Sequence, residues 1–154
     1  VRTSYEHMDE ARQRVLELLH HLLHRQSYKK RTEIALAIVQ QLEHEGQFPS
    51  ANYAFDNGVL TVDLTRVIEQ SKKHWVSELE SSRHIQWQGR WQRVDAVAAG
   101  LRQDHPESFR PVRVRCRNGE TKQWWVFTKV IRLKRYGRKR LVIVVAQKIR
   151  NSRR

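Results

Sequence analysis

The chain has 154 residues, 39% of them hydrophobic, so it suits one domain of ordinary size, or part of a larger one, with a buried core. Its formal net charge of +14 favours a polyanionic partner, above all nucleic acid, because such a field concentrates phosphate groups at the surface. No apolar run is long enough to cross a membrane and no signal segment is found, so we expect a cytoplasmic protein with no membrane partner. The single cysteine, Cys116, excludes an internal disulfide and agrees with a reducing compartment.

The first half of the chain predicts alternating helices and strands. Apolar residues at three- and four-residue spacing predict a helix over residues 8–23 and a second helix that stops at Gly46. A short strand over 52–55, a helix over 61–73 and a strand over 75–79 follow. This order implies two parallel strands joined by a crossover, as in α/β proteins.

The second half predicts a β-rich meander. A small hairpin and a short helix come first, over residues 85–94 and 94–101. Three strands are expected next, joined by tight turns at 117–120 and 136–138, and they cover residues 111–116, 122–133 and 140–146.

Charge is divided unevenly between these halves. Residues 1–81 contain 10 Lys and Arg against 12 Asp and Glu, a net charge of −2. Residues 82–154 contain 20 against 4, a net charge of +16. The first part is therefore typical of an ordinary folded scaffold, and the second of a phosphate-binding surface.

Asp56 stands at the end of the strand over 52–55, directly before Asn57 and Gly58. Ligands and ions collect at the carboxyl ends of strands in open α/β sheets. A carboxylate there is held rigidly and is exposed, which suits an ion that also binds phosphate. Taken alone, however, an Asp before Asn-Gly is more often a turn or capping residue.

An ordered run of features over roughly residues 28–146 resembles the DDE transposases of cut-and-paste insertion sequences. Tyr53-Ala54-Phe55-Asp56, followed by Lys73-His74-Trp75-Val76-Ser77-Glu78-Leu79, looks like the segment around the second catalytic aspartate of that family. The continuation resembles the β-stranded insertion that follows this aspartate, and it includes Gly89-Arg90-Trp91-Gln92-Arg93-Val94-Asp95 and Trp125-Val126-Phe127-Thr128-Lys129-Val130-Ile131-Arg132-Leu133.

The resemblance implies an α/β fold in which residues 1–81 are part of a ribonuclease H-like catalytic core. Residues 82–146 would be the basic β-rich insertion and residues 147–154 a basic tail. The family uses two Mg²⁺ ions, held by Asp, Asp and Glu, to cut and rejoin DNA at transposon ends. Only Asp56 carries over, as catalytic residue and metal ligand. The other two acids are expected beyond the ends of this chain, so we expect an internal or truncated fragment that is inactive alone.

The candidate DNA-binding residues are cations of the second half: Arg90, Arg113, Arg115, Lys134, Arg135, Arg138, Lys139 and Arg140. Those from Lys134 to Arg140 are expected at a hairpin tip, either as an ordinary solvated loop or as neutralisers of phosphate. Arg113 and Arg115 alternate with valines, so we expect one face of that strand to pack and the other to present guanidinium groups.

Tryptophans in the basic half could stack on an unpaired base, and the candidates are Trp91, Trp124 and Trp125. For each of them, burial in the core is the better supported expectation. Trp124 and Trp125 are adjacent in a strand and should point to opposite faces. The expected partners are double-stranded DNA and an intact transposase.

Two alternatives stay open. The chain could be a non-catalytic basic protein that binds DNA or inhibits an intact transposase. A less favoured alternative is a metal-dependent nuclease, because Glu120-Thr121-Lys122 has a Glu-x-Lys spacing but falls in an expected turn.

Overall fold

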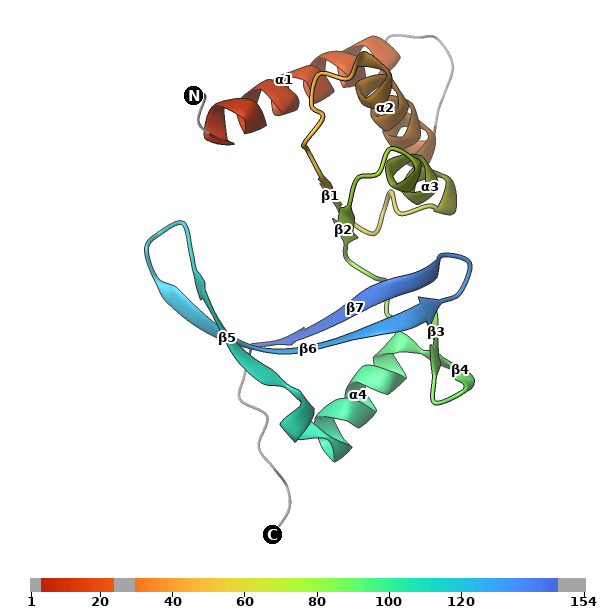
Figure 1. The fold of residues 1–154 in the computed structure, drawn as a ribbon, viewed down its shortest axis with the longest axis vertical. Helices are drawn as coiled ribbons and strands as arrows, with labels where there is room; N and C mark the ends of the chain where they lie inside the picture. Colours follow the sequence, from red (N-terminus) through yellow and green to blue (C-terminus); the bar gives the residue numbers. More distant parts are fainter. Residues whose placement is uncertain (1–3, 24–29, 147–154) are drawn as a thin grey trace. The chain divides into compact units, whose positions relative to one another are not determined.

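The computed structural model describes residues 4–23 and 30–146, and the chain divides into two compact units, Val1–Leu79 and Glu80–Arg154. In the described residues, four α-helices and two separate sheets make a mixed α/β protein (Figure 1). The division made from the sequence, between residues 81 and 82, falls close to the junction of these units. The basic tail expected over 147–154 lies outside the described residues.

Two helices form one part of the first unit. They are α1 (Ser4–Leu23) and α2 (Arg31–Glu45), and both predicted helices are confirmed. At the start of α2 the Glu33 carboxylate accepts a hydrogen bond from the Lys30 backbone N–H at 2.9 Å. The helix ends at Gly46, whose φ of 64° is the left-handed conformation that glycine adopts without strain.

The two helices pack through an apolar cluster and an ion pair. Leu18 of α1 is buried with Ile38 and Leu42 of α2. The Arg14 guanidinium donates to the Glu45 carboxylate through Nε at 3.0 Å and again through Nη2. This bidentate geometry fixes the register of α1 along α2.

A strand, a helix and a second strand complete the first unit: β1 (Tyr53–Phe55), α3 (Val62–Gln70) and β2 (Trp75–Ser77). The two strands are parallel, with Phe55 opposite Ser77, so the predicted parallel pair is confirmed. Thr61 caps α3, because its Oγ1 accepts from the Leu64 N–H at 3.2 Å. Leu64 and Ile68 are buried against the strands and α2, which holds the crossover helix on the pair.

The crossover helix is shorter than predicted, because it ends at Gln70 and not at Lys73. Lys72 has a φ of 58°, a left-handed conformation that turns the chain out of the helix. Lysine rarely adopts this conformation, so nothing in the local pattern marks the end of α3.

A largely buried lysine then ties the start of β2 to α2. Lys73 Nζ lies 2.8 Å from Glu43 Oε1 and donates to the Phe48 carbonyl oxygen at 2.8 Å. The Tyr53 hydroxyl also donates to Glu43. Burial raises the pKa of Glu43, but the hydrogen bonds from Lys73 and Tyr53 outweigh it and hold that pKa below its ordinary value. The network therefore fixes β1, and with it the strand end that carries Asp56.

The second unit is built on one antiparallel sheet in the order β4-β3-β6-β5, with β7 paired along the other edge of β6. Its strands are β3 (His84–Trp87), β4 (Arg90–Arg93), β5 (Arg110–Arg115), β6 (Thr121–Leu133) and β7 (Gly137–Val145). Between β4 and β5 run α4 (Val94–Asp104) and a short 3₁₀ helix, Pro106–Ser108, which was not predicted. The helix α4 lies along one side of the sheet (Figure 1).

The turn between β6 and β7 corrects one expectation. It consists of Lys134, Arg135 and Tyr136, so Arg138, Lys139 and Arg140 belong to β7 and do not form a hairpin tip. Left-handed φ angles of 74° at Arg135 and 77° at Gly137 close the turn tightly and let the strand start at Gly137. Tyr136 is buried, and the Arg83 guanidinium lies over its ring, with Cζ 5.8 Å from the ring centre. This cation–π contact anchors the turn.

A second expectation is wrong for β5. Every residue of this strand is exposed, including Val112 and Val114, so neither of its faces packs. The hairpin of β5 and β6 extends beyond α4 in Figure 1, so α4, the α-helix of the second unit, does not cover it.

Candidate nucleic-acid interface and strand-end carboxylate

Asp56 is the first residue after β1, and its side chain is exposed. Its Oδ1 accepts a hydrogen bond from the Gly58 N–H at 2.8 Å, which closes a tight turn. The carboxylate is thus held at the carboxyl end of a parallel pair, where open α/β sheets bind ligands. Of the two roles weighed from the sequence, the structure shows the turn role; the role of ion ligand stays a prediction.

A guanidinium lies beside this carboxylate. The point at which a Cβ on Gly58 would stand is 3.1 Å from Asp56 Oδ1 and 3.4 Å from Arg31 Nη1. The absence of a side chain at Gly58 lets both groups approach the turn. Sequence reasoning missed Arg31, because it begins α2 and no short spacing relates it to Asp56.

Asp56 does not form an ion site with other described residues. Among residues 4–23 and 30–146, no three His, Cys, Asp or Glu side chains gather where they could hold a metal ion. One carboxylate is too few for the two-ion arrangement of Mg²⁺ that the resemblance implies. Asp56 could therefore supply only one carboxylate of a larger set of metal ligands.

The strand register sorts the side chains of the second unit onto two faces. Residues directly opposite in neighbouring strands share a face, and successive residues alternate. One face, which we call the inner face, carries Ile85, Ile131, Leu133 and Leu141, all buried on the side of α4. The opposite face, which we call the outer face, has no covering element within the second unit in Figure 1.

Four residues line up across four strands of the outer face. Trp91 of β4 is opposite Gln86 of β3, Gln86 is opposite Arg132 of β6, and Arg132 is opposite Arg138 of β7. All four are exposed, Trp91 at 47%. We call this set the basic row. Arg140 lies on the same face, two residues along β7 and opposite Val130.

The register divides the eight candidate cations among different places. Only Arg138 and Arg140 lie on the outer face. Arg90, Arg113, Arg115 and Lys139 lie on the inner side, opposite Trp87, Gln123, Thr121 and Ile131, while Lys134 and Arg135 occupy the turn. The candidates therefore do not form one surface.

Sequence reasoning missed four outer-face cations: Arg93, Arg110, Lys122 and Arg132. Arg93 is paired with Asp95 of α4 at 2.6 Å. Each of the four is separated from the next cation in its strand by uncharged residues, and only an explicit count of the alternation along each strand would have grouped them. None of the residues that make up the five strands is Asp or Glu, so no strand residue of the opposite charge neutralises these cations.

The tryptophans divide in the same way. Trp124 lies opposite Val112 on the outer face and Trp125 opposite Pro111 on the inner side, and both are half-buried. The prediction that they point to opposite faces is confirmed. The expected burial of Trp91 is wrong, since this edge-strand residue has no further strand beside it. Trp87 lies on the inner face, and Lys129 Nζ lies over its ring, 4.4 Å from the ring centre.

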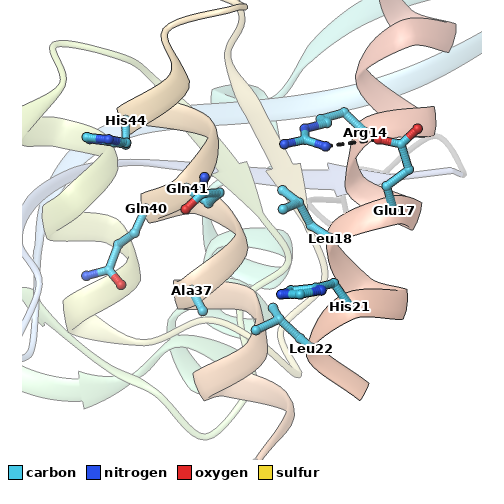
Figure 2. Close-up of a pocket in the computed structure, with 9 residues that line it drawn as sticks. All are labelled: Arg14, Glu17, Leu18, His21, Leu22, Ala37, Gln40, Gln41 and His44. Carbon is cyan, nitrogen blue, oxygen red and sulfur yellow. Dashed lines mark hydrogen bonds and ion pairs between the residues drawn. The ribbon is translucent and has the colours of Figure 1, made fainter. Parts of the chain in front are cut away.

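A groove of about 780 Å³ runs between α1 and α2. Figure 2 shows Arg14 and Leu18 of α1 on one wall and Gln40 and His44 of α2 on the other. Arg14 is already paired with Glu17 at 3.0 Å and with Glu45. Arg14 thus joins the two helices, and we do not interpret this groove as an anion-binding site.

Comparison of the chain with protein-family models, with curated proteins and with solved structures finds no match. In the part of the chain that the structure describes, no helix is both long and apolar enough to span a lipid bilayer.

Proposed function

We propose that this chain binds double-stranded DNA through the outer face of its second unit, as part of a transposase of the DDE type. The observation that carries the DNA-binding proposal is the basic row: Trp91, Gln86, Arg132 and Arg138 side by side on an acid-free sheet. Arginine binds phosphate through two parallel N–H donors, and each such contact releases counterions from the duplex.

The width of the row indicates how it meets a duplex. Strands lie about 4.8 Å apart, so the three steps from Trp91 to Arg138 span roughly 14 Å. The major groove is only about 12 Å wide, so the row is too wide to enter it, and its two arginines, on neighbouring strands at one end of the row, would contact phosphates on one side of the groove. Binding is therefore largely independent of base sequence.

Asp56 supports the transposase part of the proposal. It is exposed at the end of a parallel strand, which is where a ribonuclease H-like core presents a catalytic carboxylate to an ion and a phosphate. We propose Asp56 as one Mg²⁺ ligand of such a core, and Arg31 as a cation beside it. The family in this proposal is the one that residues 28–146 resemble, and the strand-end position of Asp56 agrees with that resemblance.

The binding proposal is tested with two matched double variants and a short duplex. Arg132→Gln with Arg138→Gln removes two cations from the outer face, and Arg113→Gln with Arg115→Gln removes two from the inner side. If both outer arginines neutralise phosphates, the first pair lowers the slope of log K against log salt by roughly 2. The second pair leaves it nearly unchanged. Equal losses from both pairs would show that the outer face is not the DNA surface.

A non-catalytic protein that binds DNA or restrains an intact transposase is the second candidate. It is favoured by the lack of a three-acid cluster among the described residues. Ion-dependent cleavage of a terminal-repeat duplex would support the enzyme, and salt-sensitive binding without cleavage would support this alternative.

A further inference from the structure

The outer face also carries an apolar surface that DNA binding does not use. Five of its valines are between 42% and 54% exposed: Val112, Val114, Val130, Val142 and Val144. Trp124 and Val126 lie among them and are half-buried. We call these seven residues the apolar stripe. So many adjacent apolar side chains on one exposed face mark an interaction surface more often than scattered single ones do.

The stripe follows the length of β6 and is separate from the basic row. Same-face residues in a strand are about 6.8 Å apart, so the four steps from Lys122 to Val130 span roughly 27 Å. An α-helix of about 18 residues has the same length. The basic row begins one step further, at Arg132.

Cations border the stripe. Lys122 is opposite Val114, Arg110 is opposite Val126, and Arg140 is opposite Val130, all on the outer face. A partner that covers the valines therefore also meets positive charge, with no strand acid to compensate it. Its complement is an apolar surface with acidic residues beside it.

We propose that the apolar stripe binds an amphipathic helix of a partner protein whose apolar face is flanked by Asp or Glu. Duplex DNA is a poor occupant, because it presents mainly phosphate and sugar to a protein surface and offers little apolar area to cover seven such side chains. A second copy of the stripe is also disfavoured, because two faces bordered by Arg and Lys repel each other. This inference stands on the valines, so it does not depend on the DNA-binding proposal.

The test uses the full chain and a labelled designed helical peptide with leucines at helical spacing and glutamates on both sides of them. A second peptide with lysines in place of the glutamates is the charge control. Binding is measured by fluorescence anisotropy. We expect the glutamate peptide to bind at least tenfold more tightly than the lysine peptide.

Three double variants locate the site. Val142→Thr with Val144→Thr keeps shape and charge and should weaken binding of the glutamate peptide several-fold. Val142→Glu with Val144→Glu should abolish it. Arg113→Glu with Arg115→Glu makes a larger charge change on the inner side and should have a smaller effect than the glutamates placed in the stripe. Circular dichroism of each variant checks that it folds, and the threonine pair remains informative if the glutamate pair does not.

Three results would overturn the proposal. One is equal binding of both peptides or of neither. Another is a threonine pair that weakens duplex binding as much as peptide binding, which would make the stripe a DNA surface. The last is self-association of the wild-type chain, measured by sedimentation velocity, that is absent in the threonine pair. That result would show that a second copy of the chain covers the stripe. Failure of the wild-type chain to bind duplex would instead count against the proposed function alone.

Discussion

Arg132 of β6 and Arg138 of β7 lie directly opposite each other on the outer face of the sheet. Like charges in this position destabilise a sheet, by an amount similar to the roughly 0.2–1 kcal/mol that an opposite-charge pair contributes. A polyanion bound across both guanidinium groups would remove this repulsion. The pair thus destabilises the free protein, and the proposed complex with DNA would relieve that repulsion.

Arg138→Glu should stabilise the second unit while it weakens DNA binding. The substitution replaces repulsion with an attractive cross-strand pair, so the free energy of unfolding should rise by roughly 0.2–1 kcal/mol. Thermal unfolding and duplex titration of the same variant measure both effects. Arg113→Glu is the control, because Arg113 lies opposite Gln123, where no like-charged pair is relieved. A variant that loses stability would show that the two arginines do not repel each other.

Trp91→Ala should weaken binding of single-stranded DNA more than binding of duplex. Stacking of a base on an exposed tryptophan contributes about 1–3 kcal/mol, and a duplex offers few unstacked bases. Anisotropy titrations with labelled single strands and duplexes measure the difference. Trp91→Phe retains a ring and should lose less. If the alanine variant binds both forms as the wild type does, Trp91 is an exposed edge residue with no stacking role.

Substitutions of Asp56 separate its turn role from its charge. Asn keeps an oxygen that can accept from the Gly58 N–H, whereas Ala loses this hydrogen bond. We expect Asp56→Asn to keep nearly the wild-type free energy of unfolding and Asp56→Ala to lose about 0.5–1.5 kcal/mol. Chemical denaturation measures both. A large loss of stability in the Asn variant would mean that the fold itself needs the charge of Asp56, and would weaken the case for an ion ligand.

The ion pair between the first two helices predicts a pH dependence. Hydrogen bonds from Arg14 and Gln41 lower the pKa of Glu45 to about 2 from an ordinary value of 4.5. Because the folded pKa is the lower one, the stabilisation is fully present above about pH 4.5 and is lost as the pH falls towards 2. Urea unfolding across this range should show the loss in the wild type. The loss should be smaller in Glu45→Gln. If the free energy of unfolding falls equally steeply with pH in both proteins, protonation of Glu45 is not its cause.

Local patterns were sufficient for most of the elements. Apolar spacing placed α1 and α2, Gly46 marked the end of a helix, and the order of elements implied the parallel strands beside Asp56. These features depend on neighbours a few residues away, which a sequence displays directly. The end of α3 at Lys72 was missed because a left-handed lysine has no such signal.

The composition of the candidate interface was also visible in the sequence, but its arrangement was not. Residues 82–154 carry a net charge of +16, which by itself indicates a polyanion-binding part of the chain. Alternation in a strand defines two faces without saying which one a helix covers. The tertiary structure decided this, because α4 packs on one side only and the register of β6 with β3 and β7 brings Trp91, Arg132 and Arg138 into one row. Residues so far apart in the chain meet through hydrogen-bonded pairing between strands, and no local spacing encodes that pairing.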